Sequence, residues 1–346
     1  MVSLGRRQWG CLAAAGWLCT FAAQSAVSET QKVRLGLSMR NSMNQLPLML
    51  ADQLGYFRQA GIALEWQEFD TDAQVHQALM AGLLDVACGT FDQVLDLNAQ
   101  GQKVKAFVLQ GRTPQISLGI AMRHLASYQS LADLKRFKIG IADVSSPTAA
   151  MAQLWCLKGG LNPRDMQWVE VGRMHAAMDQ LRSGAVDALC HFDPVMSWLE
   201  YRSDLRVVAE TRTLQGAQQW LDGACAASCL LAKTDFLQLK PTLVQGLADG
   251  VVRALKWLMT AGPTDLLKTI PPQAWIGDRA FYLGTVDKLR ESYCPDGWFG
   301  EDLVQAAGRS RAWRLGLPRP QATDRSILQA AYTNDAVQKS KKRFPI

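Results

Sequence analysis

Short apolar runs alternate with amphipathic stretches along the first two thirds of the chain. VRLGL at 33–37 has the composition of a buried strand. The amphipathic stretch LMLADQLGYFRQAG follows Pro47, which suits a first helical turn, and ends on a glycine. IALEWQEF at 62–69 alternates as a strand does, and 72–83 again has helical periodicity. Because strands that alternate with helices form β-α-β units, the pattern predicts an α/β fold with mainly parallel sheets.

One helix–turn–strand unit occurs twice. LMAGLLDVACGTFD at 79–92 and LRSGAVDALCHFDP at 181–194 share Leu, Gly, Asp and Cys at a constant offset of 102 positions. The shared glycine comes shortly after each helical stretch, where helices commonly end. A chance match between two ordinary helix–strand junctions is the alternative, but the repeat favours two lobes of the same topology.

The length of the chain also favours two lobes, because 346 residues exceed what one hydrophobic core usually supports. The strand–helix pattern restarts after ISLGIAMR, and ACAASCLLAK at 224–233 is typical of a strand that returns to the first lobe. From 235 onward the chain is mostly helical. We therefore expect a discontinuous first lobe, 33–118 plus 224–346, and a second lobe at 119–223.

The amino-terminal segment has the features of an export signal. Arg6 and Arg7 precede an uncharged run at 10–23, and small residues suited to cleavage follow at 25–28. The apolar run is shorter than the roughly 20 residues that a membrane-spanning helix needs. GRRQWG also resembles part of a twin-arginine signal, so the Sec and twin-arginine routes both stay open. We expect 1–28 to be removed and the mature protein to be periplasmic, soluble and monomeric.

The net charge of +6 comes from the two ends of the chain. Arg6 and Arg7 lie in the first ten residues and four further basic residues in the last eight; without these six, basic and acidic residues are equal in number. A neutral body argues against nucleic-acid binding. The cysteines beyond the signal are widely spaced and mostly lie in apolar runs, which is typical of buried thiols, and the sequence assigns no disulfide among them.

The motifs of common catalytic sites are missing from the sequence. It has no G-x-S-x-G, P-loop, G-x-G-x-x-G or H-E-x-x-H pattern, and its four histidines do not cluster. Cys190 and His191 are adjacent, but neighbouring strand residues point to opposite faces, so they are not expected to meet as nucleophile and base. The sequence therefore predicts a protein that is not an enzyme and has neither a metal nor a cofactor.

Polar loops follow several of the predicted strands, and ligands of open α/β sheets bind beyond the carboxyl ends of the strands. DVSSPTA at 143–149 is the most specific of these loops, because Ser145 or Ser146 can cap a helix whose first turn contains Pro147. The unpaired amide groups at such a helix start attract a carboxylate or sulfonate. Plain helix capping explains the same residues, so both interpretations stay open.

Several of these motifs, in the same order, resemble a known family. PLMLADQLGYFRQAGIALEWQEF, QALMAGLLDVACGT, SLADLKRFKIGIADVSSPT and AAMDQLRSGAVDALCHFDP resemble the nitrate/sulfonate/taurine-type periplasmic solute-binding proteins, which share a fold with the NMT1/THI5-like group. The resemblance implies a two-lobed type II clamp with a ligand cleft between the lobes. It also implies delivery of a small solute to an ABC permease and its ATPase.

The ligand contacts implied by the resemblance fall in the polar loops. The candidate positions are Ser38, Asn44, Gln45, Thr90, Arg112, Ser145, Ser146, Thr148, His191 and Asp193. Arg112 favours an organic anion over a neutral heterocycle, because a guanidinium forms charge-assisted bonds to anions. Asp193 can instead meet a ligand amine or cap the following helix. Two other functions stay open: a pyrimidine- or cofactor-precursor enzyme on the same fold, and the ligand-binding partner of a sensory receptor.

Overall fold

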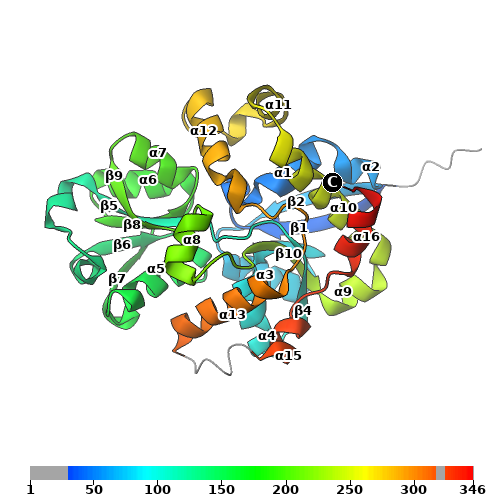
Figure 1. Cartoon of the computed structure of the whole chain (residues 1–346), viewed down its shortest axis with the longest axis horizontal. Coiled ribbons are helices and arrows are strands. Elements are labelled where there is room, and N and C mark those ends of the chain that lie inside the picture. Colours follow the sequence, from blue (N-terminus) through cyan, green and yellow to red (C-terminus); the bar gives the residue numbers. More distant parts are fainter. Residues whose placement is uncertain (1–29, 317–323, 346) are drawn as a thin grey trace, which may run out of the picture.

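Two five-stranded β-sheets lie side by side, each covered by helices (Figure 1). The computed structural model describes residues 30–316 and 324–345, so the predicted export signal lies outside the described residues. The first sheet has the strand order β2-β1-β3-β10-β4 and the second β7-β6-β8-β5-β9. We call each sheet, with the helices packed on it, the first or the second lobe.

In each sheet one strand opposes the direction of the others. The strands of the first sheet are β1 (Gln31–Leu37), β2 (Ile62–Glu68), β3 (Val86–Thr90), β4 (Val104–Leu109) and β10 (Ser228–Lys233). Those of the second sheet are β5 (Ile116–Ala121), β6 (Lys138–Ile141), β7 (Gln167–Glu170), β8 (Ala188–Phe192) and β9 (Leu205–Glu210). The reversed strands, β10 and β5, are antiparallel to both of their neighbours. Both sheets are therefore mostly parallel but mixed, because the strand that enters from the other lobe runs the opposite way.

Helices cover the faces of both sheets. The second lobe carries α5 (Pro147–Lys158), α6 (Met174–Ser183), α7 (Val195–Tyr201) and α8 (Leu214–Leu221). The other α-helices are α1 (Leu46–Gln53), α2 (Tyr56–Gln59), α3 (Asp72–Met80), α4 (Phe91–Ala99), α9 (Thr234–Leu239), α10 (Pro241–Thr260), α11 (Pro263–Thr269), α12 (Arg279–Leu289), α13 (Glu301–Leu315), α15 (Arg325–Ala330) and α16 (Asp335–Arg343). Short 3-10 turns are η1 (Met43–Gln45), η2 (Met122–Ser127), η3 (Leu131–Arg136), η4 (Pro163–Asp165), η5 (Pro272–Ala274) and η6 (Arg290–Ser292).

The two copies of the sequence repeat occupy equivalent places in the two lobes. The first copy joins α3 to β3 and the second joins α6 to β8, and the shared glycines have φ values of 75° and 82°, in the left-handed region that favours glycine. Asp85 Oδ2 accepts a hydrogen bond from the backbone amide of Arg34 at 2.9 Å. Asp187 Oδ2 accepts one from the amide of Lys138, also at 2.9 Å. Each shared aspartate thus fixes its turn to the neighbouring strand, β1 in the first lobe and β6 in the second.

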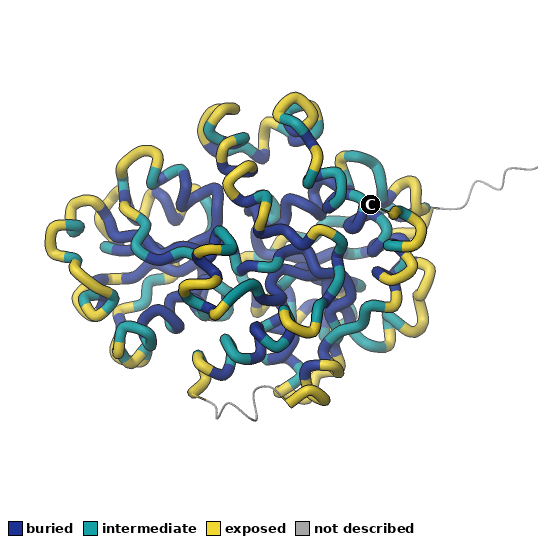
Figure 2. The backbone as a smooth tube through the Cα atoms, viewed as in Figure 1, coloured by how far each residue is buried: buried dark blue, intermediate teal, exposed yellow. Residues whose placement is uncertain are grey.

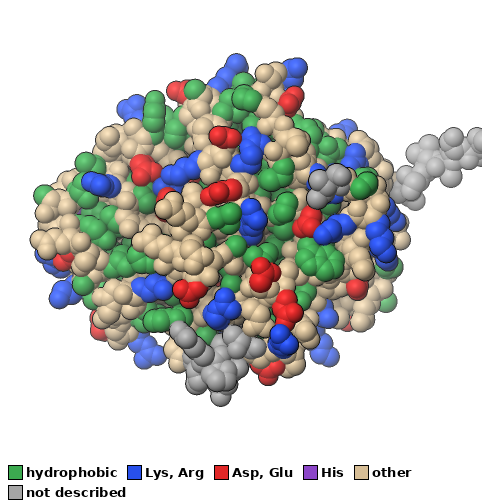
Figure 3. All heavy atoms as spheres, viewed as in Figure 1, with side chains coloured by type: hydrophobic (Ala, Val, Ile, Leu, Met, Phe, Trp, Pro, Cys, Tyr) green, Lys and Arg blue, Asp and Glu red, His purple; other side chains and the backbone are tan. Residues whose placement is uncertain are grey.

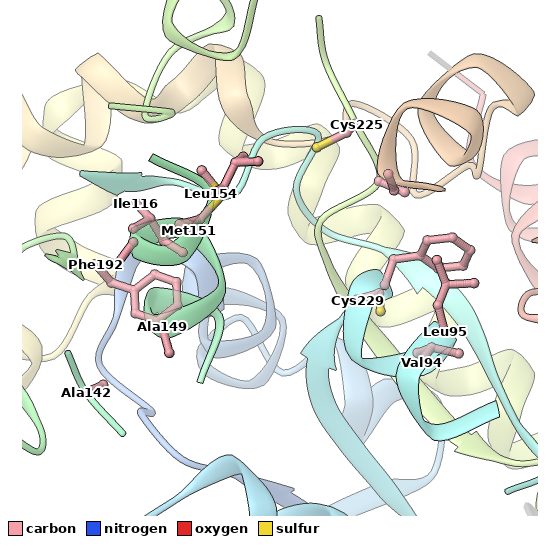
Figure 4. Close-up of a cluster of buried hydrophobic side chains, with 14 of the residues drawn as sticks. Val94, Leu95, Ile116, Ala142, Ala149, Met151, Leu154, Phe192, Cys225 and Cys229 are labelled. Carbon is pink, nitrogen blue, oxygen red and sulfur yellow. The ribbon is translucent and has the colours of Figure 1, made fainter. Parts of the chain in front are cut away.

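Buried residues follow the two sheets, and exposed residues lie mainly at the periphery (Figure 2). One cluster packs α1 and α10 on the first sheet, and another packs α6 and α7 on the second. A third cluster contains residues of both lobes: Val94 and Leu95 from the first, and Met151, Leu154 and Phe192 from the second (Figure 4). The lobes therefore share apolar contacts as well as chain crossings.

Basic and acidic side chains are interspersed over the face of the molecule shown in Figure 3. This agrees with the balanced charge of the body of the sequence. Within the part of the chain that the structure describes, none of the helices combines the length and the hydropathy of a membrane span.

Candidate ligand-binding cleft

A cavity of about 610 Å³ lies between the two lobes. Its walls come from α3, α4 and α13 on one side, and from α5 and the loop before it on the other. Cavities that hold small organic ligands commonly measure roughly 300–1,000 Å³. The cavity is therefore of a size to take a small organic solute.

The start of α5 forms the second-lobe wall of the cavity. Ser146 caps this helix, since its hydroxyl accepts a hydrogen bond from the amide of Ala149 at 3.4 Å, and Pro147 occupies the first turn. Ser145 reaches the first lobe, where its Oγ accepts a hydrogen bond from the amide of Ala73 at 3.0 Å. Both serines line the cavity. Ser146 therefore both caps α5 and lines the cavity.

Gln93 on α4 connects the two walls. Its Oε1 accepts a hydrogen bond from the amide of Thr90 at 2.9 Å. Its Nε2 donates to Asp72 Oδ2 at 3.1 Å and to the backbone oxygen of Ser145 at 3.4 Å. One amide side chain therefore ties the carboxyl end of β3 and the start of α3 to the loop before α5.

Two titratable groups of α3 have shifted pKa values. Burial raises the pKa of Asp72 to about 6, although hydrogen bonds from Ser38 and Gln93 lower it in part; the charge of Asp143 in the second lobe raises it further. Burial lowers the pKa of His76 to about 4, so that ring is neutral at pH 7. Asp72 and Asp143 place two carboxyl groups at the seam between the lobes.

A balanced charge cluster forms part of the first-lobe wall. Arg314 on α13 donates from Nη2 to Asp92 Oδ2 and to Asp96 Oδ2, both at 2.8 Å. Arg311 donates from Nε to Asp96 Oδ1 at 2.7 Å. Asp92, Asp96 and Arg314 all line the cavity. Two guanidinium groups and two carboxylates thus offset each other at this wall.

Three of the ten predicted contact residues, Thr90, Ser145 and Ser146, line the cavity. Ser38 lies behind the cavity wall: its hydroxyl donates to Asp72 Oδ1 at 2.6 Å, and Asp72 in turn accepts a hydrogen bond from Gln93, which lines the cavity. The polar loops at the ends of β1, β3 and β6 therefore meet between the lobes, as the position of ligand sites in α/β sheets predicts.

Asn44, Gln45 and His191 are buried outside the cavity lining. Gln45 Oε1 accepts a hydrogen bond from the Cys88 thiol at 2.7 Å, in the middle of the first lobe. His191 Nε2 lies 3.2 Å from the backbone oxygen of Gly172 in the second lobe. These side chains contact protein groups here, and their role as ligand contacts stays a prediction.

Thr148, Asp193 and Arg112 also have protein partners outside the cavity. Thr148 Oγ1 accepts a hydrogen bond from the amide of Ala142 at 2.9 Å. Asp193 Oδ1 accepts one from the amide of Ser197 in the first turn of α7 at 2.7 Å, although Pro194, and not Asp193, occupies the N-cap of that helix. Arg112 Nε donates to a backbone oxygen of η6 at 2.9 Å. The arrangement gives Arg112 a partner within the first lobe rather than a place in the cavity wall.

Sequence reasoning misses several residues of the cavity wall: His76, Asp92, Gln93 and Arg314. His76 and Arg314 lie inside helices at positions that no motif marks. Gln93 does have a usable signal, because Thr90 and Gln93 form a T-x-x-Q capping pattern. Arg314 reaches the cavity only through the packing of α13 against α4 and α5, which the sequence does not reveal.

Arg173, directly before α6, makes charged contacts with the first lobe. Its Nη1 lies 2.8 Å from Glu68 Oε1 and its Nη2 lies 2.9 Å from Asp70 Oδ1. Nη1 also donates to the backbone oxygen of Ser38 at 3.4 Å. The Arg173 side chain is 36% exposed, and exposed ion pairs contribute little to folding stability. These contacts span the two lobes, so a movement of the lobes away from each other would break them.

We expect Arg173→Ala to shift the solute-free protein towards an open arrangement and to weaken solute binding several-fold, because closure loses three contacts that span the lobes. Small-angle X-ray scattering of the solute-free protein measures the opening as a larger radius of gyration. Arg182→Ala is the matched control, since Arg182 is 38% exposed and pairs with Asp204 inside the second lobe at 2.8 Å. Equal radii and equal affinities for the two variants would contradict the expectation.

The family of the chain follows from comparison with known proteins. A family profile described as "NMT1/THI5 like" matches residues 42–264, which is more than half of the chain. The chain belongs to this family. A solved protein structure from Bordetella bronchiseptica RB50 is 31% identical, with a TM-score of 0.84, and the alignment covers 92% of this chain and 99% of that chain.

More distant relatives carry functional names. The alkanesulfonate-binding protein SsuA from Xanthomonas axonopodis pv. citri, solved with bound MOPS, is 18% identical, with a TM-score of 0.69, over 88% of this NMT1/THI5-like chain and 98% of SsuA. At this identity the likeness shows the fold alone. The nitrate import ATP-binding protein NrtC from Synechococcus elongatus is 26% identical over 178 residues, which are 47% of this chain and 26% of NrtC. The chain thus spans about a quarter of the length of this curated relative.

Proposed function

We propose that this NMT1/THI5-like protein is the exported, periplasmic solute-binding component of an ABC importer. It captures a small organic anion or a related solute, of the sulfonate, taurine or nitrate type, between its lobes. It then delivers the solute to a membrane permease and its ATPase. The observation that carries the proposal is the cavity between the lobes, whose walls come from both of them.

Closure of the lobes is the proposed mechanism of capture. Solute contacts on both walls favour the closed arrangement, in which the start of α5 meets α3 and α4. The names of two similar proteins, one for alkanesulfonate binding and one for nitrate import, support the solute classes and the transporter partner.

An enzyme on the same fold is the main rival function. Cys88 lies at the centre of the first lobe, where burial raises the pKa of its thiol to about 12. Gln110 Nε2 donates a hydrogen bond to the Cys88 sulfur at 3.3 Å, and the thiol donates to Gln45. Since the thiolate is the nucleophilic form of cysteine, these surroundings disfavour a thiol-dependent reaction at this position.

A thermal-shift screen of the purified protein tests the proposed function. The panel contains taurine, alkanesulfonates, nitrate, aromatic carboxylates and pyrimidines. A solute at about 100 times its Kd adds roughly 2.7 kcal/mol to the free energy of unfolding, which raises the unfolding temperature measurably. We expect a selective shift with the compound recovered unchanged. Conversion of the compound to a product would replace the proposal by the enzyme, and no shift across the panel would contradict the proposed solute classes.

A further inference from the structure

The last described helix carries an excess of positive charge. α16 contains one acidic residue, Asp335, and four basic residues, Lys339, Lys341, Lys342 and Arg343. It lies at the end of the first lobe that is remote from the second lobe (Figure 1). Since acidic and basic residues balance in the body of the sequence, the excess is concentrated at this end of the molecule.

Contacts with α10 fix which side of α16 points outward. Ala336, Val337 and Ser340 are buried. The Ser340 hydroxyl donates a hydrogen bond to Asp249 Oδ1 at 2.5 Å. Gln245 Nε2 donates to the same oxygen at 2.7 Å and to the backbone oxygen of Ala336 at 3.0 Å. The helix is therefore held in one rotation about its axis, with a constant set of side chains on its outer side.

The outer side of α16 exposes polar and charged residues only. These are Asp335, Gln338, Lys339, Lys342 and Arg343. Lys339 and Lys342 lie about one helical turn apart, and neither has an ion-pair partner within the part of the chain that the structure describes. We call Lys339, Lys342 and Arg343 the basic face; it presents three positive charges to solvent.

The acidic partners of α16 lie beneath its basic residues. Arg343 Nη1 is 2.7 Å from Asp249 Oδ2, and the side chains are 55% and 13% exposed. Lys341 Nζ is 2.5 Å from Asp296 Oδ2, which is again the less exposed partner. Burial lowers the pKa of Lys256 on α10, Asp296 raises it in part, and the charge of Lys341 lowers it again. Positive charges are thus crowded at this surface, where external anions would stabilise them.

The composition of the outer side favours a lipid surface over a protein partner. Protein–protein contacts depend on aromatic or apolar side chains that become buried at their centre. The exposed residues of α16 include none of these. A bilayer with anionic headgroups supplies closely spaced negative charges, and clusters of basic residues on a helix bind such a surface.

We propose that the basic face binds the anionic phospholipid headgroups of the membrane that contains the permease. Each basic residue near such a surface contributes about fivefold in affinity, so the attachment is weak and reversible. α16 takes no part in the cavity wall, so attachment leaves the lobes free to close. The proposal goes beyond the proposed function and depends on it only for export of the protein.

Co-flotation with lipid vesicles tests the proposal. The protein is used in its exported form, because the apolar run at 10–23 would attach to any vesicle by itself. We expect vesicles with about 25% phosphatidylglycerol in phosphatidylcholine to bind the protein about tenfold or more tightly than phosphatidylcholine alone. Raising the NaCl concentration from about 50 to about 500 mM should abolish this preference, because salt screens exposed charges.

Two double variants assign the binding to the basic face. Lys339→Gln with Lys342→Gln should weaken binding to the anionic vesicles about tenfold or more, and both side chains are exposed, so the packing of α16 is kept. Lys135→Gln with Lys138→Gln is the matched control. It removes the same charge from two exposed lysines of the second lobe, also three positions apart, and it should bind as the wild type does.

The remaining outcomes overturn the proposal. Equal binding to the two vesicle compositions would leave an acidic protein as the partner of the basic face. Binding that persists at high salt, or that falls equally in the two double variants, would show that the basic face does not recognise the lipid. The thermal-shift screen needs no vesicles, so failure of the lipid proposal leaves the solute-binding function standing.

Discussion

Replacing Arg212 with alanine is expected to lower the free energy of unfolding by about 3–5 kcal/mol. Arg212 is 1% exposed, between β9 and α8. Its Nη1 lies 3.7 Å from Asp193 Oδ2, and its Nη2 pairs with Glu200 and with Glu210. Asp193 is fully buried, so the substitution would leave a buried carboxylate without a counter-charge. Urea denaturation of the variant and of the wild type measures the difference.

Two further variants test whether the loss of stability comes from the buried charges. Arg206→Ala removes an exposed arginine from the neighbouring strand β9 and should change the stability by less than about 0.5 kcal/mol. Because much of the cost arises from Asp193, adding Asp193→Asn to Arg212→Ala should recover part of the loss. A loss of stability in Arg212→Ala no larger than that in Arg206→Ala, or a double variant that loses the sum of both single effects, would contradict the expectation.

The fold was predictable from the sequence where the local pattern of apolar and polar residues determines the structure. Alternating strands and helices predicted both sheets, and the repeated Leu, Gly, Asp and Cys predicted two equivalent helix–strand junctions, which the contacts of Asp85 and Asp187 reproduce. The reversal of β5 and β10 was not predictable in the same way. Their direction depends on the end of the neighbouring strands at which the chain arrives from the other lobe, and no local sequence pattern determines this.

Residues of the cavity wall were predictable at strand ends and helix starts, but not along helix faces. Thr90 is the last residue of β3, and Ser145 and Ser146 come after β6, so the rule for α/β sheets applies to all three, and all three line the cavity. Asp92 and Arg314 are 222 positions apart, and they meet only because α13 packs on α4. Arg112 shows the converse: its guanidinium suggested an anion partner, but the fold gives it a backbone oxygen of η6 instead.

Asp72 is expected to make the protein less stable at neutral pH than at mildly acidic pH. Its pKa in the folded protein is about 6, against an ordinary value of 3.8, so the folded state holds a proton between these pH values that the unfolded state has released. As the pH rises through 6, the folded state also loses this proton, and the stability that came from binding it is lost. Between pH 4.5 and 7.5 we expect the free energy of unfolding to fall by about 2 kcal/mol from this group alone.

Comparison with Asp72→Asn isolates this effect. The variant has no titratable group at position 72. Between pH 4.5 and 7.5 its free energy of unfolding should therefore rise by about 2 kcal/mol relative to that of the wild type. His76 acts in the opposite sense, because its lowered pKa removes stability as the pH falls, but it is present in both proteins and cancels in the comparison. The exposed Asp179, changed to Asn, should reproduce the wild-type pH dependence.

The same measurement bears on closure of the lobes. Ser38 and Gln93 of the first lobe and Asp143 of the second surround the Asp72 carboxyl group, so separation of the lobes would remove part of its burial and return its pKa towards 3.8. Closure around a solute near pH 5 should therefore take up protons, and calorimetry in two buffers of different ionisation enthalpy would detect them. Proton uptake that is equal in the wild type and in Asp72→Asn would show that Asp72 is not the group that responds to closure.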